Sequence, residues 1–202
     1  MTDVSTPTTL TGTHFVPKGK LTAAVTWLGM TAPPPPAALP DEPRLRRIAA
    51  PELAGYRALF RRVGDDWLWT SRLVLSDAAL AAIIGNPRVE VYAVERDGAE
   101  IGMVELDLRT DGEVEIVYFG LIKEAVGQGL GRLVMAKALQ SAWRPGITKA
   151  WLHTCTHDHP GAMKFYTSCG FVPYAFGIDI FDDPRLTGLL PRSAAPHIPL
   201  ID

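Results

Sequence analysis

Residues 127–131 read Gly-Gln-Gly-Leu-Gly, and this stretch decides the fold, because it lies between a predicted buried strand (114–121) and a predicted helix (about 128–142). The first N–H groups of a helix have no partner within it, and glycines let an anion approach the backbone, so this turn suits a pyrophosphate. A dinucleotide-binding fingerprint has another glycine spacing, and a P-loop has Gly-Lys-Ser/Thr where this chain has Gly131-Arg132-Leu133. A tight turn whose glycines serve only packing is the alternative.

Three strands in close order precede the glycine turn, over residues 89–95, 101–108 and 114–121. Asp97-Gly98 and Asp111-Gly112 separate them, and Asp-Gly is a signal for a tight hairpin. This order predicts an antiparallel meander.

Helices and strands are predicted on both sides of the meander. An amphipathic helix is expected over residues 51–63, and a second helix, capped by Ser76, over 77–84. After the glycine turn and its helix, the pattern predicts a strand, a short helix and a last strand, at residues 150–154, 160–168 and 171–180. The order of elements indicates the α+β class with a mixed sheet.

The chain divides into three parts at the sequence level. Residues 1–44 read as an N-terminal arm, with a strand predicted over 21–30 and a proline-rich spacer at 33–36. Residues 45–182 form the expected main domain, and residues 183–202 a C-terminal tail.

Composition limits the classes of partner. The 202 residues suit one ordinary domain, and the net charge of -2 has no basic cluster for nucleic acid. No apolar run approaches the roughly 20 residues that span a bilayer, and residues 1–13 do not resemble a signal peptide. Two cysteines are too few for a disulfide framework, so we expect a cytoplasmic protein with neither nucleic acid nor membrane as partner.

A second motif follows the glycine turn, namely Ala162-Met163-Lys164-Phe165-Tyr166 and then Cys169-Gly170-Phe171. Together the two motifs resemble those of the GNAT superfamily of acetyl-CoA-dependent N-acetyltransferases, with the match running from about residue 89 to 180. The resemblance implies a mostly antiparallel central sheet flanked by helices, with a splayed pair of strands that forms the acyl-CoA cleft.

The resemblance also implies the roles of individual residues. Backbone amides of the glycine turn would hold the pyrophosphate of coenzyme A, and the preceding strand would pair with its pantetheine arm. Tyr166 would protonate the departing thiolate, and Glu115 is the first candidate for the general base, with Glu105 and Asp107 as alternatives. The residues implied to bind the cofactor are Phe119, Gly120, Leu121, Gly127, Gln128, Gly129, Leu130, Gly131, Arg132, His159 and Tyr166.

The chain departs from the family pattern at two positions. Val126 stands where the family usually has Arg or Gln, so side-chain help to the phosphates would come from Gln128 or Arg132. His159 stands where many relatives have an Asn that contacts pantetheine.

Four potential metal ligands alternate in the sequence, at His153, Cys155, His157 and His159. On one straight strand such side chains diverge, so we expect no metal site. A zinc-dependent hydrolase is the third-ranked reading of the sequence.

We therefore expect an enzyme that moves an acetyl group from acetyl-CoA to a small-molecule or peptide amine by direct transfer in a ternary complex. A homodimer is compatible with the sequence. The alternative is a non-catalytic domain that binds or senses acyl-CoA; Val126 and His159 favour it, whereas Tyr166 and Glu115 oppose it.

Overall fold

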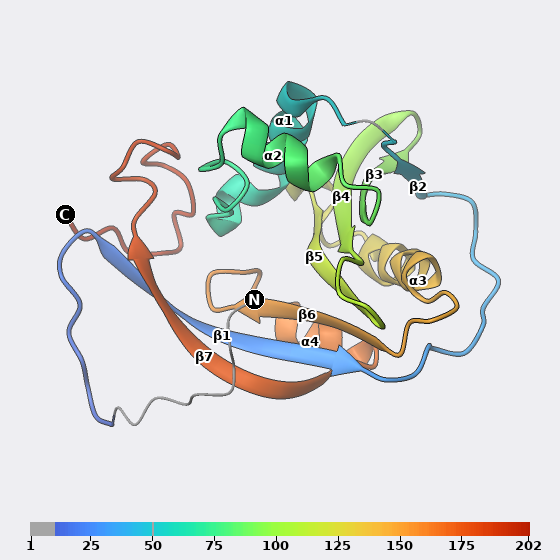
Figure 1. Ribbon diagram of the computed structural model, residues 1–202. Coiled ribbons are helices and arrows are strands. Elements are labelled where there is room, and N and C mark those ends of the chain that lie inside the picture. The colour runs from blue at the N-terminus through green and yellow to red at the C-terminus, as the bar shows by residue number, and fades with distance from the viewer. Residues whose placement is uncertain (1–10, 50) are drawn as a thin grey trace.

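The computed structural model describes residues 11–49 and 51–202 (Figure 1). The strands are β1 (Lys20–Met30), β2 (Arg44–Arg47), β3 (Val89–Arg96), β4 (Ala99–Asp107), β5 (Glu113–Leu121), β6 (Lys149–Cys155) and β7 (Val172–Asp182). The helices are α1 (Leu53–Gly64), α2 (Asp77–Ile84), α3 (Leu130–Ala142) and α4 (Ala162–Ser168), with short 3₁₀ turns η1 (Asp65–Trp67) and η2 (Lys123–Ala125). None of the helices in the described part is long and apolar enough to cross a bilayer.

The seven strands form one sheet in the order β2-β3-β4-β5-β6-β1-β7. Every pair of neighbours is antiparallel except β5 and β6, which are parallel. This is the α+β class with a mixed, mostly antiparallel sheet, as predicted. The Asp97-Gly98 hairpin is confirmed too, since both residues have positive φ, 52° and 77°.

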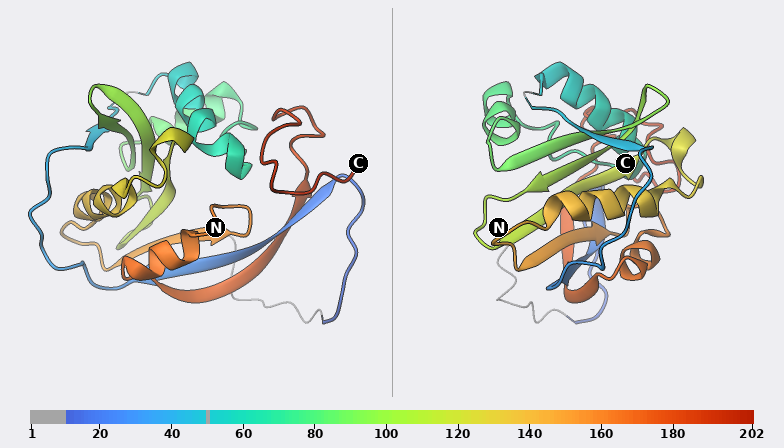
Figure 2. Two further views of the ribbon diagram at one scale, coloured as in Figure 1. Left: turned by 180° about the vertical axis from the view of Figure 1, so that it is seen from behind. Right: turned by 90° about the vertical axis from the view of Figure 1, so that its right-hand side faces the viewer.

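Helices cover both faces of the meander, as the right-hand view of Figure 2 shows. α1 and α2 pack on one face through Phe60 and Leu80 against Met103 of β4, and all three are fully buried. The next residue of β4, Val104, points to the other face and packs with Met135 of α3. Alternate residues of a strand face opposite sides, so β4 is buried on both.

β1 belongs to the central sheet. The strand predicted over 21–30 is present, and β1 pairs with both β6 and β7, so this part of the predicted N-terminal arm completes the sheet of residues 45–182. β1 and β7 run side by side as a long curved ribbon in Figure 1. The chain after β7 coils beyond the end of that ribbon, and the Gly19 amide donates to the Ile201 carbonyl at 3.0 Å.

Candidate active site

The two parallel strands separate soon after they meet. β5 and β6 pair only from Glu113 to Glu115, although β5 continues to Leu121 and β6 to Cys155. A bulge helps to turn β5, because Tyr118 pairs with Glu105 whereas Ile116 pairs with Leu106, which leaves one extra residue between them. A cleft of about 1340 Å³ lies at this separation.

The edge of β5 that faces the cleft offers unpaired backbone groups. The amide of Ile122 donates to the Ile101 carbonyl at 2.9 Å, on the β4 side. Backbone groups of successive strand residues alternate between the two edges, so those of Leu121 and Phe119 face the other side, where β6 has diverged. This edge can accept an extended ligand as a further strand would be accepted. Phe119, Gly120 and Leu121 all line the cleft.

The glycine turn follows directly at the mouth of the same cleft. Gly127 and Gly129 have φ of 82° and 75°, a left-handed conformation that favours glycine. A Cβ at either position would meet nothing within 4 Å, so the space beside the turn is open. Within residues 11–49 and 51–202, no backbone carbonyl accepts from the amides of residues 127–129. Together with the first amides of α3, these groups are free to donate to an anion.

Two cleft-lining residues, Leu130 and Gly131, begin α3. Gly131 packs closely on α4, since a Cβ there would lie 3.3 Å from the Phe165 ring. This glycine therefore serves packing between the two helices as well as the turn.

The side chain of Gln128 is already engaged. Its Nε2 donates to the Glu124 carbonyl at 2.7 Å, and its Oε1 accepts from Arg96 Nη1 at 2.8 Å. Arg96, which the sequence patterns do not single out, thus stands beside the turn at the end of β3. Arg132 is exposed on α3, and neither it nor the Gln128 side chain lines the cleft.

Tyr166 lines the cleft from α4. Its ring lies edge-on to Phe119 at 6.3 Å and to Phe171 at 6.3 Å. Burial raises the pKa of Tyr166 above its ordinary value, and the nearby Asp158 carboxylate adds to this. The phenol therefore keeps its proton at neutral pH and can act as a donor.

Glu115 does not line the cleft, because its carboxylate lies behind His153. Glu115 Oε1 is 3.5 Å from His153 Nδ1, and the His153 ring lines the cleft from β6. The hydrogen bond to Glu115 raises the pKa of His153. With Nδ1 held by the carboxylate, the other ring nitrogen is left for the cleft.

Glu105, one of the alternatives predicted for the general base, is not free to take that role. It is fully buried, and its two oxygens accept from Arg72 Nη2 at 2.6 Å and from the Tyr56 hydroxyl at 2.5 Å. Both oxygens of its carboxylate are thus occupied by donors, and the carboxylate holds in place Arg72, which lines the cleft. Asp107 is bound by the guanidinium of Arg109, with a shortest contact of 2.5 Å.

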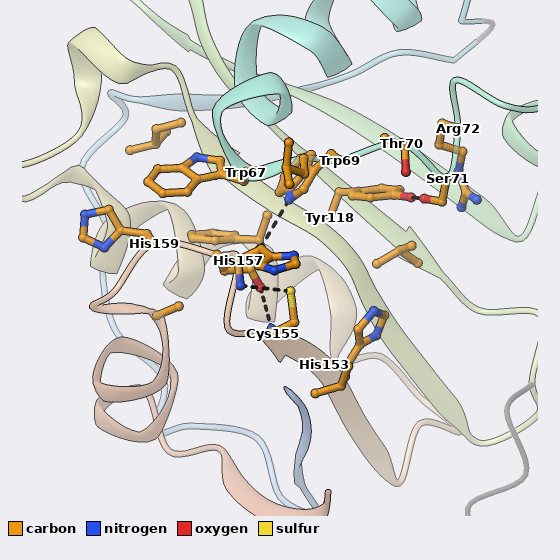
Figure 3. Close-up of a pocket in the computed structure, with 18 of the residues that line it drawn as sticks. Trp67, Trp69, Thr70, Ser71, Arg72, Tyr118, His153, Cys155, His157 and His159 are labelled. Atoms are coloured by element: carbon orange, nitrogen blue, oxygen red, sulfur yellow. Dashed lines mark hydrogen bonds between the residues drawn. The ribbon is translucent and has the colours of Figure 1, made fainter. Parts of the chain in front are cut away.

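Aromatic and polar side chains from the loop after α1 close the cleft from above (Figure 3). Trp69 Nε1 reaches Asp158 Oδ1 at 3.5 Å, across the cleft from the turn after β6. The other oxygen of Asp158 accepts from the Thr154 hydroxyl at 2.6 Å and the Cys155 amide at 2.8 Å.

His159 also lines the cleft, and one of its ring nitrogens is engaged by the backbone. Its Nδ1 accepts from the Gly161 amide at 3.0 Å, just before α4, and its ring lies 5.4 Å from Trp67. The ring nitrogen nearest the backbone is therefore used, and contact with a pantetheine arm stays a prediction.

The alternating histidines and cysteine do not share one strand face. β6 ends at Cys155, so His157 and His159 lie in the following turn, where His157 packs edge-on against Phe181 at 5.7 Å. No group of three His, Cys, Asp or Glu side chains in the described part of the chain could hold a metal ion.

Two parts of the cleft have no clear signal in the sequence. Asp179 and Phe181 line it from β7, although nothing local indicates that this strand reaches the site. The C-terminal tail contributes a further wall, made of Pro184, Thr187, Gly188 and Leu189. Both depend on long-range placement that no motif encodes.

The fold and this splayed cleft place the chain among α+β proteins of the N-acetyltransferase type. Solved structures share the fold at low identity. A functionally unknown conserved protein from Staphylococcus epidermidis aligns over 81% of this chain with 15% identity and a TM-score of 0.54. GCN5-related N-acetyltransferases align from Sphaerobacter thermophilus (16% identity, 79% of this chain, TM-score 0.57) and Kribbella flavida (23%, 84%, 0.51). The chain spans 63%, 51% and 63% of these three chains in turn.

The model of the acetyltransferase (GNAT) family matches residues 56–171, more than half of the chain, and the chain belongs to this family. No curated protein matches the sequence. The matched range contains the meander, the glycine turn and the Tyr166 helix, whereas β1, β7 and the tail lie outside it.

Proposed function

We propose that this protein transfers an acetyl group from acetyl-CoA to a primary amine by direct transfer in a ternary complex. One observation carries the proposal: the unpaired edge of β5, the open glycine turn and the Tyr166 side chain all border the same cleft. The strand edge could pair with the pantetheine arm, the turn could hold the pyrophosphate, and the tyrosine could donate a proton to the sulfur of the thioester.

The cleft fits coenzyme A through its backbone. The amides from Gly127 to Arg132 would hold the pyrophosphate, and the edges of Phe119 and Leu121 would pair with the pantetheine arm. Open space beside Gly127 and Gly129 supports this assignment, since side chains there would fill the cradle. When bound, the thioester supplies an activated acetyl group.

The amine must lose a proton to attack the thioester carbonyl. His153 is positioned to accept that proton when its ring is neutral, with Glu115 orienting the ring as a positioning residue. A backbone N–H of β5 polarises the carbonyl oxygen. The amine nitrogen bonds to the carbonyl carbon, the carbon–sulfur bond breaks, and the leaving sulfur takes its proton from the Tyr166 hydroxyl.

Direct transfer is preferred over an acyl-cysteine route because of the state of Cys155. This thiol borders the cleft, but burial, with a smaller contribution from Asp158, raises the pKa of Cys155 to about 11. A neutral thiol is a poor nucleophile. We expect Cys155→Ala to retain acyl transfer.

The alternative is an acyl-CoA-binding domain without turnover, which the exposed Val126 and the engaged side chain of Gln128 favour. The test is to mix the protein with acetyl-CoA and a panel of amines, and to measure free thiol together with cofactor binding by calorimetry. Thiol release that depends on the amine supports the enzyme. Tight binding with no release for any amine supports the alternative.

Tyr166→Phe sharpens that test. Loss of a general acid lowers kcat by about 10²–10⁴-fold, while the affinity for acetyl-CoA stays the same, because the hydroxyl acts only as the sulfur leaves. Unchanged turnover in Tyr166→Phe contradicts the assignment.

A further inference from the structure

The tail after β7 is fixed in place as a wall of the cleft. Arg185 is buried, binds the Asp183 carboxylate at 2.7 Å, and donates to backbone carbonyls further along the tail, including that of Ile198 at 2.8 Å. The tail also packs on the loop that carries the tryptophans, through Leu68 and Leu190. Because tail residues line one side of the cleft, they limit the room there for an extended polypeptide.

Three aspartates line the cleft, and one of them, Asp182, pairs with Lys20 at 2.6 Å. Among the residues that the structure describes, the other two, Asp158 and Asp179, form no ion pair. Arg72, a cation in the opposite wall, is neutralised by Glu105 at 2.6 Å. The pKa of His153 is raised mainly by its hydrogen bond to Glu115, and that of Cys155 mainly by burial; the charges of Asp158 and Asp179 add to both.

These two aspartates differ in what they can still bind. One oxygen of Asp158 accepts from the Thr154 hydroxyl and the Cys155 amide, and the other accepts from Trp69 Nε1. Asp179 is exposed, and the hydrogen bonds of the described residues include none to its carboxylate. Asp179 is therefore the acid with capacity left for a ligand.

Aromatic rings complete the same part of the cleft. Trp69 and Tyr118 face it from above, with ring centroids 5.0 Å apart, and Phe181 faces it from β7 beside Asp179. Figure 3 shows Trp67, Trp69 and Tyr118 along one wall and His153 on the other. The Arg72 guanidinium already lies over the Tyr118 ring, 5.2 Å from its centroid. The faces of the other rings can attract an ammonium group.

We propose that the acceptor is a small molecule carrying a second positive charge besides the amine that is acetylated, and that Asp179 holds this second charge. The inference rests on the proposed acyl transfer and names its substrate class. The tail that lines the cleft limits the size of the acceptor, the aromatic rings accommodate a cation, and the carboxylate of Asp179 can pair with that cation. Asp179 is thus a specificity-determining residue.

The test uses three acceptors with the same chain and reactive amine: cadaverine, pentylamine and aminovaleric acid. They differ only at the far end, which is positive, neutral or negative. We expect kcat/KM for cadaverine to exceed that for pentylamine by about tenfold, as one charge-assisted hydrogen bond provides, and to exceed that for aminovaleric acid by more. A peptide with one lysine is expected to be a poor acceptor because of the tail.

Variants assign the effect to the residue. Asp179→Asn also removes a charge that raises the pKa of His153, so the kinetics are compared at a pH where that ring is neutral in both proteins. There the variant should raise KM for cadaverine about tenfold and leave the pentylamine kinetics unchanged. Asp111→Asn, on the hairpin between β4 and β5, is the matched control and should change nothing. Asp179→Lys should reverse the preference in favour of aminovaleric acid, which keeps the test decisive if one variant folds poorly.

The outcomes separate this inference from the function on which it rests. Equal use of pentylamine and cadaverine, or preference for aminovaleric acid by the unaltered protein, overturns the inference while acyl transfer stands. A lysine peptide that performs as well as cadaverine overturns it too. No thiol release with any acceptor overturns acyl transfer, and the inference with it.

Discussion

Replacing Glu105 by leucine should destabilise the protein severely. Glu105 is fully buried and accepts from Arg72 at 2.6 Å and from Tyr56 at 2.5 Å. The Glu105→Leu variant leaves a guanidinium that is 12% exposed without its counter-ion, and a buried hydroxyl without its acceptor. Breaking a buried ion pair from one side costs about 3–5 kcal/mol. For a chain of this size, that corresponds to a fall in Tm of roughly 6–20 °C.

The assay is urea unfolding followed by circular dichroism, together with a thermal melt, on matched variants. Glu113→Gln is the control, since Glu113 pairs with Lys149 at 3.4 Å and both side chains are about a third exposed. Such a surface pair contributes about 0–1 kcal/mol. The double variant Arg72→Met/Glu105→Leu should recover most of the loss, because no unpaired charge remains buried.

Two results would refute this reasoning. A loss of stability in Glu105→Leu no larger than in Glu113→Gln means that the buried contacts of Glu105 do not stabilise the fold. A double variant as unstable as the sum of its single variants means that the charges are not coupled.

Three further predictions concern catalysis, cofactor binding and the core. Glu115→Gln removes the main cause that raises the pKa of His153. Since the neutral ring accepts the proton, the rise of kcat with pH should move to lower pH. An unmoved profile argues against His153 as base. Gly129→Ala places a side chain at φ 75°, which costs about 1–2 kcal/mol in the turn. Calorimetry should therefore show weaker acetyl-CoA binding, while the part of the sheet away from the turn keeps its structure. Leu28→Ala, at a fully buried site in β1, should lower the free energy of unfolding by about 2–5 kcal/mol in the same urea assay; a smaller loss would mean that β1 is not part of the core.

Local patterns in the sequence predict most of the elements, because the signals involved are themselves local. Ser76 caps α2 by accepting from the Ala79 amide at 3.2 Å, and Asp97-Gly98 makes its hairpin with both φ values positive. The glycine turn is where the spacing predicts it, between β5 and α3. Backbone conformation at each of these points is set by a few neighbouring residues.

Placement across the sheet is not predictable in the same way. β1 reads as part of a separate arm, because the proline run follows it, yet it pairs with two strands that come more than a hundred residues later. Tertiary pairing of this kind leaves only an apolar, β-branched pattern in the sequence. The tail is similar, since its order depends on Arg185, whose carbonyl partners could not be identified before the fold was known.

The carboxylates of this site show why residue type alone cannot assign a catalytic role. Glu105 and Glu115 lie on adjacent strands and were both reasonable candidates for the base. One is buried between Arg72 and a tyrosine hydroxyl, so its lone pairs are occupied; the other has a histidine as neighbour, and that histidine borders the cleft. Since proton transfer requires contact with the acceptor amine, we propose His153 as the base and Glu115 as the residue that orients it. The Asp179 carboxylate has no hydrogen bond or ion pair within the described part of the chain and affects His153 only through its charge, so in our proposal it recognises the substrate rather than activating it.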